Sequence, residues 1–291
     1  MIERGLAMKS VVVTGSSTGI GWGVAKVLIS KGFRVFGSVR KTADGARLKA
    51  EFGANFVPVQ FDVTDEAAVA RGAAEVAAAL GGETLAGLVN NAGIAVAGPL
   101  LFLKLAEFRQ QIEVNITGQL IVTQAFAPLI GADSSRKGKP GRIVMITSIG
   151  GRNANPFMGA YCASKFGLEG MSESLRRELM IYGIDVIVVA PGAVATPIWD
   201  KADQVDPKIY ANTPYMASLQ KVKDYMLALG RKGLKPEALG EAVWIALTAA
   251  KPKVRYTVAP NPLENFLTGN LPKRMVDNLI AGQLGLKRVR N

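Results

Sequence analysis

Short apolar runs rich in β-branched residues alternate along the chain with longer segments in which apolar residues recur at helical spacing. The short runs predict strands at 10–14, 34–39, 56–61, 85–89, 142–147, 184–190 and 254–258. The longer segments predict helices that follow the first strand directly and at 65–80, 107–130, 157–182 and 236–250. Strands that are apolar throughout and alternate with helices are typical of α/β proteins with a doubly wound parallel sheet.

The same pattern shows no internal break that would separate two domains. The chain has 291 residues, of which 49% are hydrophobic, enough for one large core. We expect one domain at 8–260 and a C-terminal extension at 261–291. Within the domain, 198–235 is a long insertion with a mixed helical pattern rich in aromatic residues and Met. Such residues pack in cores more often than they contact ligands, but the position also suits a substrate lid.

Composition narrows the chemistry further. The chain has no histidine and a single cysteine, Cys162, which excludes histidine-activated nucleophiles, histidine-ligated metals and an internal disulfide. Acid–base chemistry must therefore use Tyr, Lys, Asp or Glu, and we expect no metal site. The apolar runs are too short to predict a membrane span, and the N-terminus lacks a signal-peptide core, so we expect a cytoplasmic protein.

The net charge of +12 raises the question of a polyanionic partner. The basic residues are scattered rather than interleaved with aromatic residues in one tract, so we expect a solvated basic surface and no nucleic-acid binding. Attraction to an anionic substrate, a dinucleotide phosphate or a membrane surface is the alternative.

A glycine-rich turn follows the first predicted strand and opens the first helix. Backbone N–H groups at a helix N-terminus face anions, and Gly15, Gly19 and Gly21 allow a phosphate to approach the backbone closely. This arrangement predicts dinucleotide binding by a Rossmann-type sheet.

The end of the second strand bears on the choice of dinucleotide. Residues 37–41 read GSVRK and contain no carboxylate that would hold a ribose 2′-hydroxyl, whereas Arg40 would accommodate a 2′-phosphate. The sequence therefore favours NADP(H) over NAD(H), although Arg40 could also be a solvated loop charge. Asp62, after the third strand, suits either a turn or the adenine end of the cofactor.

Candidate catalytic residues lie between 148 and 165. Tyr161 and Lys165 are four residues apart on a predicted helix and therefore share a face, and Ser148 ends the preceding strand. We expect the ammonium to lower the phenol pKa from about 10 toward neutrality, as a general acid or base requires. Asn115, on an otherwise apolar helix face, needs partners if it is buried.

Taken together, these segments resemble the short-chain dehydrogenase/reductase family over roughly residues 9–258. The resemblance is carried by TGSSTGIG at 14–21, NNAG at 90–93, Asn115, Ser148, YCASK at 161–165, and PG at 191–192 followed by Thr196. The segment KVRYTVAP and the tail beyond it also look like the branch that acts on steroids, retinoids and other lipophilic alcohols.

The resemblance implies reversible hydride transfer between a nicotinamide and a carbonyl or secondary alcohol. It assigns proton exchange to Tyr161, pKa control and ribose binding to Lys165, substrate orientation to Ser148, and a proton relay to Asn115. The cofactor-binding positions that it implies are Gly15, Ser17, Gly19, Ile20, Gly21, Arg40, Asp62, Val63, Asn90, Ala92, Gly93, Tyr161, Lys165, Pro191, Gly192, Val194 and Thr196.

The sequence thus predicts an NADP(H)-dependent oxidoreductase acting on a small, lipophilic carbonyl or alcohol. A cofactor-sensing regulatory protein without turnover and a sugar-nucleotide epimerase are the alternatives. The family also implies a homodimer or homotetramer that pairs the helices at 107–130 and 157–182. These helices carry apolar residues on more than one face, namely Leu120, Ile121, Phe126, Phe166, Met171 and Leu175.

An apolar substrate mouth is expected where the chain leaves Thr196. Its predicted members are Ile198, Trp199, Tyr210, Tyr215, Met216 and Met226, with Phe266, Leu267, Leu271 and Met275 from the tail. The tail residues could instead pack a neighbouring subunit or rest on a membrane surface.

Overall fold

A single parallel sheet organises the protein. The computed structural model describes residues 8–203, 206–260 and 271–286. Seven strands pair in the order β3-β2-β1-β4-β5-β6-β7, and every pair is parallel. Their bounds are Ser10–Val13, Arg34–Val39, Phe56–Gln60, Gly87–Asn90, Arg142–Ile146, Asp185–Pro191 and Arg255–Val258 for β1 to β7. The predicted fold class and all seven predicted strands are confirmed.

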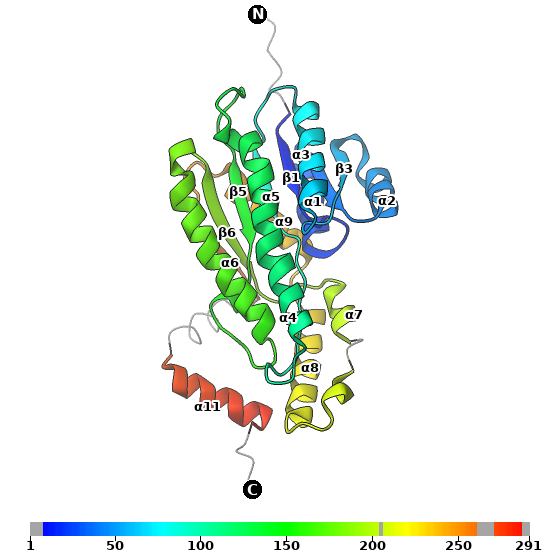
Figure 1. The fold of residues 1–291 in the computed structure, drawn as a ribbon, viewed down its shortest axis with the longest axis vertical. Helices are drawn as coiled ribbons and strands as arrows, with labels where there is room; N and C mark the ends of the chain where they lie inside the picture. Colours follow the sequence, from blue (N-terminus) through cyan, green and yellow to red (C-terminus); the bar gives the residue numbers. More distant parts are fainter. Residues whose placement is uncertain (1–7, 204–205, 261–270, 287–291) are drawn as a thin grey trace, which may run out of the picture.

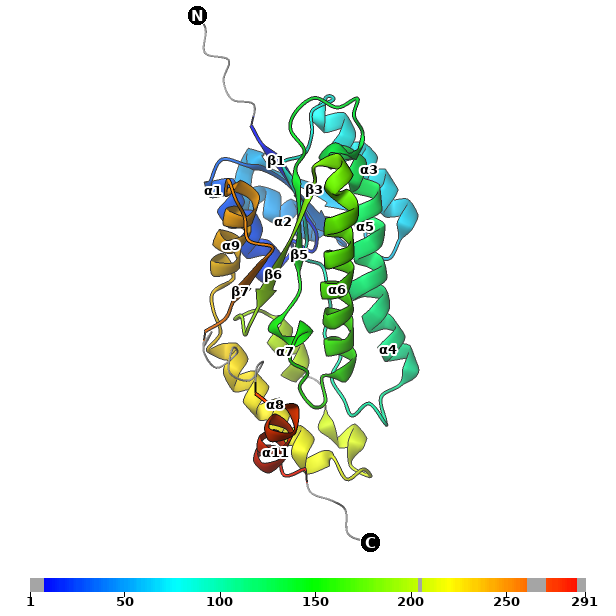
Figure 2. The ribbon, with the colours of Figure 1, turned by 90° about the vertical axis from the view of Figure 1, so that its left-hand side faces the viewer.

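Helices cover both faces of the sheet (Figures 1 and 2). One layer holds α1 (Gly19–Ser30), α2 (Thr42–Phe52) and α9 (Pro236–Thr248). The other holds α3 (Glu66–Leu80), α4 (Leu105–Ile112), α5 (Gly118–Ala127) and α6 (Gly159–Glu178). Each layer forms its own buried apolar cluster against the sheet, so a strand such as β1 is apolar on both faces, with Val12 in one cluster and Val11 and Val13 in the other.

The helices differ from the predicted ones in three respects. Helix α2 was not predicted, because it has few apolar residues and buries only Gly45 and Leu48. The run predicted at 107–130 contains a π-helical turn at Glu113–Thr117 and a second at Pro128–Ala132. Helix α6 starts two residues late because Phe157 adopts a φ of 64°, outside the helical region.

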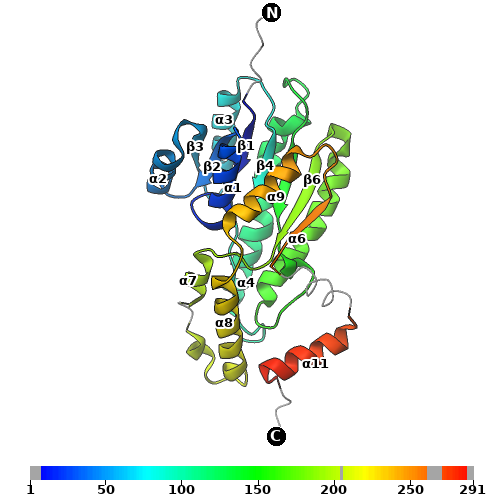
Figure 3. The same ribbon diagram turned by 180° about the vertical axis from the view of Figure 1, so that it is seen from behind.

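The predicted lid is helical and packs together with the C-terminal tail. It comprises α7 (Ile198–Asp203), a 3₁₀ turn at Pro207–Tyr210, and α8 (Met216–Arg231), and the tail forms α11 (Lys273–Leu284). Figure 3 shows α8 and α11 beyond the same end of the sheet. Phe157, Tyr210, Leu219 and Val222 form a third small core there, joined by Leu284 and Leu286 at and beyond the end of α11.

The helices proposed for subunit contacts are mostly committed to the core. Phe126 is fully buried, which excludes it from an interface, whereas Phe166 is exposed. Within the described part of the chain, the helical run Leu105–Ala132 alone is long and apolar enough by composition to span a membrane. Its most apolar window is 44% buried and packs on the sheet, as core helices do. The homo-oligomer stays a prediction.

Helices α1 and α9 approach each other through glycines. A Cβ on Gly23 would lie 2.5 Å from the backbone of Pro236, and one on Gly240 would lie 2.7 Å from the Gly23 carbonyl oxygen. Both contacts involve backbone atoms, so neither can be relieved by a side-chain rotation. The close crossing of these helices therefore requires glycine at both positions.

We predict that Gly23→Ala lowers the free energy of unfolding by about 1–3 kcal/mol, because α9 must move away from α1. Gly170→Ala is the control, since it adds the same methyl group inside α6 with no atom within 4 Å. That variant should gain about 0.5–1 kcal/mol from helix propensity. Urea denaturation measures both, and equal effects would contradict the proposed packing constraint.

Candidate active site

The candidate site lies where the parallel strands end at their carboxyl termini. The chain adds strands outward on one side of β1, from β2 to β3, and then returns to add β4 on the other side. The order of the strands therefore reverses between β1 and β4. Ligands of doubly wound sheets bind outside such a reversal. The glycine-rich turn follows β1, Asn90 ends β4, Ser148 lies just beyond β5, and Pro191 ends β6. The topology thus places these predicted residues at one edge.

The glycine-rich turn has the shape of a phosphate cradle. Gly15 and Gly19 have φ values of 64° and 60°, which side chains rarely adopt. A Cβ on Gly21 would lie 2.2 Å from the Gly15 carbonyl oxygen, so a side chain there would fill the turn. Thr18, the N-cap of α1, makes no side-chain cap, and the first turn of α1 holds no acidic residue. An anion can therefore approach the first N–H groups of α1.

Asn91 locks this cradle to the end of β4. Its side-chain amide donates hydrogen bonds to the carbonyl oxygens of Thr14 at 2.8 Å and Gly15 at 3.2 Å. The Thr14 hydroxyl in turn accepts bonds from the backbone N–H groups of Asn91 and Ala92 at 2.9 and 3.0 Å. Asn91 was not among the predicted site residues, although its place in the NNAG run could have indicated it.

The side chain of Asn90 points away from the glycine-rich turn, toward α5. The side chain is fully buried and donates to Thr123 Oγ1 at 2.8 Å, on the side of α5. Its Oδ1 atom and Gln119 Oε1 lack a hydrogen-bond partner among the described residues. Asn90 therefore ties the sheet to α5 with its side chain and can offer the cleft only its backbone.

Two buried amides fix the loop that follows β4. Asn115 Oδ1 accepts from the Ile94 N–H at 2.9 Å, and its Nδ2 donates to the Ile94 carbonyl and to Ser164 Oγ, both at 3.0 Å. Gln111, one turn earlier, bonds Val96 N–H and the Ile94 carbonyl in the same manner. These bonds supply the partners that a buried Asn115 requires. Because Asn115 and Gln111 both bond Ser164, they also link α4 and the π-helical turn that follows it to α6. Gln111 was missed, although its spacing of four from Asn115 places it on the same face.

Ser148 and Tyr161 meet at the mouth of β5. The Ser148 hydroxyl accepts from the Gly150 N–H at 2.9 Å and hydrogen-bonds the Tyr161 phenol. Burial raises the pKa of Tyr161 above its ordinary value, while the bond with Ser148 opposes that increase. The expectation of a lowered phenol pKa is therefore wrong for the cofactor-free structure. Burial penalises the phenolate more than the neighbouring groups stabilise it.

The position of Lys165 accounts for the absence of a lowered pKa at Tyr161. Its Nζ atom donates to the Ile146 carbonyl at 2.9 Å and lies 5.8 Å from the centre of the Tyr161 ring. Burial lowers the pKa of Lys165 to about 8, and the negative charge of Glu169 acts in the opposite direction. Lys165 is thus poised to gain or lose its proton near neutral pH.

Glu169 lies one helical turn beyond Lys165 and is held on three sides. It accepts from Thr147 Oγ1 at 2.7 Å and from Arg255 Nε at 3.1 Å, and it lies 3.7 Å from Arg152 Nε. Its side chain is only 15% exposed. The carboxylate therefore separates the ammonium of Lys165 from two guanidinium groups. Sequence reasoning missed Glu169, because its partners come from β7 and from the loop after β5.

The chain that leaves β6 closes over the cradle. Gly192 N–H donates to the Val258 carbonyl at 2.8 Å, and Val194 forms a bridge with Leu234. Thr196 reaches the glycine-rich turn, because a Cβ on Gly19 would lie 3.2 Å from its side chain. Thr196 therefore lies beside the glycine-rich turn, and its contact with the cofactor stays a prediction.

The predicted adenosine end lies at the exposed edge of the site. Arg40 is largely exposed and lies 3.8 Å from Asp62. Asp62 Oδ1 accepts from the N–H and hydroxyl of Thr64, so Asp62 has the turn role that the sequence left open. Val63 is buried against Gly118. Ser17 offers its carbonyl to Arg47 of α2 at 2.6 Å, a second guanidinium near the cradle that was not predicted.

Comparisons with known proteins agree with this arrangement. A sequence model of the family described as short chain dehydrogenase matches residues 9–206. An NADPH-dependent 3-dehydrocapnine reductase of Ornithobacterium rhinotracheale is 38% identical over 281 residues, which are 95% of this chain and 98% of that protein. Retinol dehydrogenase 16 of Mus musculus is 31% identical over 94% of this chain and 87% of its own length.

A solved structure shows the same fold. The crystal structure of a short-chain dehydrogenase from Streptomyces avermitilis superposes with a TM-score of 0.75 at 26% identity, covering 97% of this chain and 98% of that one. The glycine cradle, the reversal of strand order and the Ser148–Tyr161–Lys165 cluster fit a nicotinamide dinucleotide and an oxidoreductase acting on CH–OH groups. The chain belongs to the short-chain dehydrogenase family and is an NAD(P)-dependent oxidoreductase.

Proposed function

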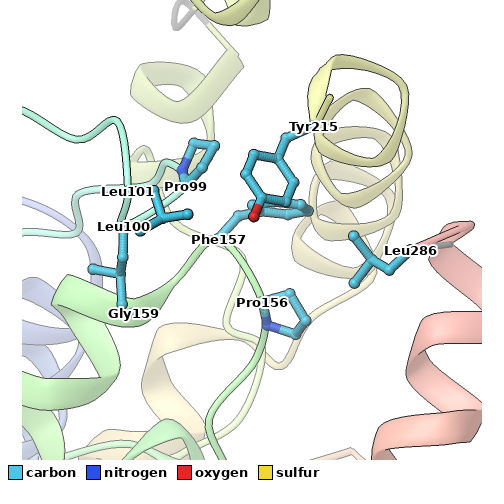
Figure 4. Close-up of a pocket in the computed structure, with 8 residues that line it drawn as sticks. All are labelled: Pro99, Leu100, Leu101, Pro156, Phe157, Gly159, Tyr215 and Leu286. Atoms are coloured by element: carbon cyan, nitrogen blue, oxygen red, sulfur yellow. The ribbon is translucent and has the colours of Figure 1, made fainter. Parts of the chain in front are cut away.

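We propose that the protein reduces a lipophilic ketone or aldehyde, or oxidises the matching alcohol, with NADP(H) as cofactor. The observation that supports this most is an apolar pocket of about 240 Å³ beside the start of α6. Figure 4 shows its lining, which comes from the loop before α4, the loop before α6, the start of α8 and the tail after α11. The lining residues are Pro99, Leu100, Leu101, Pro156, Phe157, Gly159, Tyr215 and Leu286.

The pocket adjoins the proposed catalytic residues along the chain. Gly159 lines it and begins α6, and Tyr161 lies in the first turn of that helix. The tyrosine hydroxyl of Tyr215 is its one polar side-chain group. A pocket of this lining favours substrates with apolar surface. The names of two relatives, a retinol dehydrogenase and a reductase of a 3-dehydro compound, support an apolar alcohol or a ketone as substrate.

Of the predicted mouth residues, Tyr215 lines the pocket, while Tyr210 and Met226 pack in the small third core. Trp199 lies against Gly230, so it is part of the packing between α7 and α8. Phe266 and Leu267 lie outside the described residues.

The chain's own groups have separate roles in the proposed reaction. Bound nicotinamide supplies hydride to the carbonyl carbon, or accepts it from the alcohol. The Ser148 hydroxyl would orient the substrate oxygen, and the Tyr161 phenol would give that oxygen its proton. Lys165 would stabilise the phenolate that remains, and Asn115 would hold the loop that closes this side of the site. Cytoplasmic location stays a prediction from the sequence.

The substrate class is tested with a series of ketones of rising chain length or ring number. Because added apolar area enters the pocket, we predict that kcat/KM rises along the series, followed by loss of reduced-nicotinamide absorbance. A flat or falling series would show that the pocket does not select lipophilic substrates.

We predict that Tyr161→Phe lowers kcat by about 10²–10⁴-fold, because it removes the hydroxyl that exchanges the proton. Cofactor affinity should be unchanged, whereas Lys165→Met should lose both activity and affinity. Tyr182→Phe, an exposed tyrosine beyond the end of α6, is the matched control. Activity of Tyr161→Phe above a tenth of wild type would refute the assignment of proton exchange to Tyr161. Wild-type protein that binds cofactor without any turnover would support the regulatory alternative.

Arg40 carries the proposed cofactor preference, because no carboxylate lies between 37 and 41 to hold a ribose hydroxyl. We predict that Arg40→Ala weakens NADP(H) binding about tenfold or more and leaves NAD(H) binding unchanged. Arg71→Ala, an exposed charge on α3, is the control. Titration of both cofactors measures this. Equal affinities in the wild type would rule out the preference.

Glu169 gives a prediction for pH dependence. Its charge raises the pKa of Lys165, and Arg255 and Arg152 would lose their counter-charge in Glu169→Gln. Both effects favour the neutral amine, so Lys165 loses its proton at lower pH. The high-pH limb of the reduction rate should therefore move down by about half a unit or more. Glu173→Gln is the control, because Glu173 lies one turn further along α6 and is exposed; it should leave the pH profile unchanged. A wild-type pH profile for Glu169→Gln would contradict the proposed coupling.

A further inference from the structure

The connection between β4 and α4 presents apolar side chains to solvent. Residues 100–105 read LLFLKL, and Leu100, Leu101, Phe102 and Leu105 are all exposed, Leu101 by 80%. Scattered exposed apolar residues are ordinary, but four within six positions form a contiguous patch of the kind that marks an interaction surface. We name these four residues the leucine lip.

Helix α11 presents a second apolar stripe at the same end of the molecule (Figures 1 and 2). Met275 and Leu279 are four residues apart, share a face and are both more than half exposed. Val276, Ile280 and Leu284 are only partly exposed, and Leu284 packs against the small third core. The C-terminal end of α11 therefore packs on the protein, while Met275 and Leu279 expose apolar surface to solvent.

The apolar pocket opens between these two surfaces. Leu100 and Leu101 of the lip line one side of it and Leu286, just beyond α11, lines the other (Figure 4). The apolar surface is therefore continuous from the exposed lip to the pocket interior. An apolar ligand could pass between them without crossing a polar rim.

The charges around the two surfaces are more basic than acidic. Lys104 lies within the lip, and Lys273 and Arg274 open α11, all three exposed. The acidic residues nearest to them in the chain are Glu107 and Asp277, and the whole chain carries a net charge of +12. Apolar side chains that alternate with lysine and arginine suit the headgroup region of an anionic bilayer, where apolar groups enter and basic groups meet lipid phosphates.

We propose that the leucine lip and the Met275–Leu279 stripe dock on the surface of an anionic lipid bilayer, with the substrate pocket facing that bilayer. The passage of substrate from bilayer to pocket rests on the proposed function; the docking does not. Contact is peripheral and reversible, because both surfaces are short and the apolar helical run that begins at Leu105 packs on the sheet.

The test is sedimentation of the full chain with vesicles of phosphatidylcholine that contain phosphatidylserine, and with vesicles of phosphatidylcholine alone. We expect binding to the first that weakens with added salt, and weak binding to the second. Leu105→Gln with Leu279→Gln should reduce the bound fraction several-fold. Neither residue lines the pocket, so turnover of a small water-soluble ketone should be kept.

Ile181→Gln is the matched control. Ile181 is 80% exposed, as Leu101 is, but it follows α6 beside Met180 and does not line the apolar pocket. It should bind vesicles like the wild type. Absence of vesicle binding, or equal loss in the control, would overturn the proposal. A fall in oligomeric mass of the double variant in light scattering would also overturn it, because the face would then belong to a second copy of the chain.

The two proposals can fail separately. Vesicle binding uses no substrate, so its absence alongside a rising substrate series would reject only the docking surface. A flat substrate series alongside salt-sensitive vesicle binding would reject only the lipophilic substrate.

Discussion

The buried ammonium of Lys165 needs compensating partners, and the arrangement at the carboxyl end of this sheet supplies them. Lys165 is only 5% exposed, and a charge removed from water must be compensated by fixed partners. The Ile146 carbonyl at the end of β5 and the carboxylate of Glu169 supply that compensation. Glu169 is in turn held by Arg255 of β7 and by Thr147. The edge strand β7 is therefore coupled to α6 through one carboxylate, which gives β7 a direct electrostatic link to the candidate site.

The same low-dielectric environment shifts the pKa of the neighbouring Tyr161 phenol. A low-dielectric environment disfavours both the ammonium of Lys165 and the phenolate of Tyr161, so it lowers one pKa and raises the other. The free protein thus holds Tyr161 as a proton-bearing phenol, hydrogen-bonded to Ser148, which is the form needed to protonate a carbonyl oxygen. The apolar pocket begins beside this cluster, because Phe157 and Gly159, just before Tyr161 in the chain, line it.

The strands and their order of appearance were predictable, because they depend on local sequence in the form of β-branched runs. The candidate site residues also followed from local features, namely a glycine turn and a tyrosine and lysine one turn apart. What could not be predicted depends on distant partners. Glu169 acquires its role only when β7 brings Arg255 beside it, and the direction of the Tyr161 pKa shift depends on burial that the spacing of residues does not reveal. Asn90 was placed in the right turn, yet its side chain follows the hydrogen bond offered by Thr123. The exposure of Leu101 and Leu105 likewise reflects how the loop leaves β4, which apolar composition alone would assign to a core.

The central claim is that Tyr161 is a partly buried phenol whose proton the reaction uses. The most direct measurement is a spectrophotometric titration of phenolate absorbance in the wild type minus that in Tyr161→Phe, without cofactor and with saturating NADP⁺. The account predicts that Tyr161 titrates above the ordinary value of about 10 in the free protein and at lower pH when the positively charged nicotinamide ring of NADP⁺ is bound. A phenol that already titrates below 10 in the free protein, or that is indifferent to the cofactor, would contradict it.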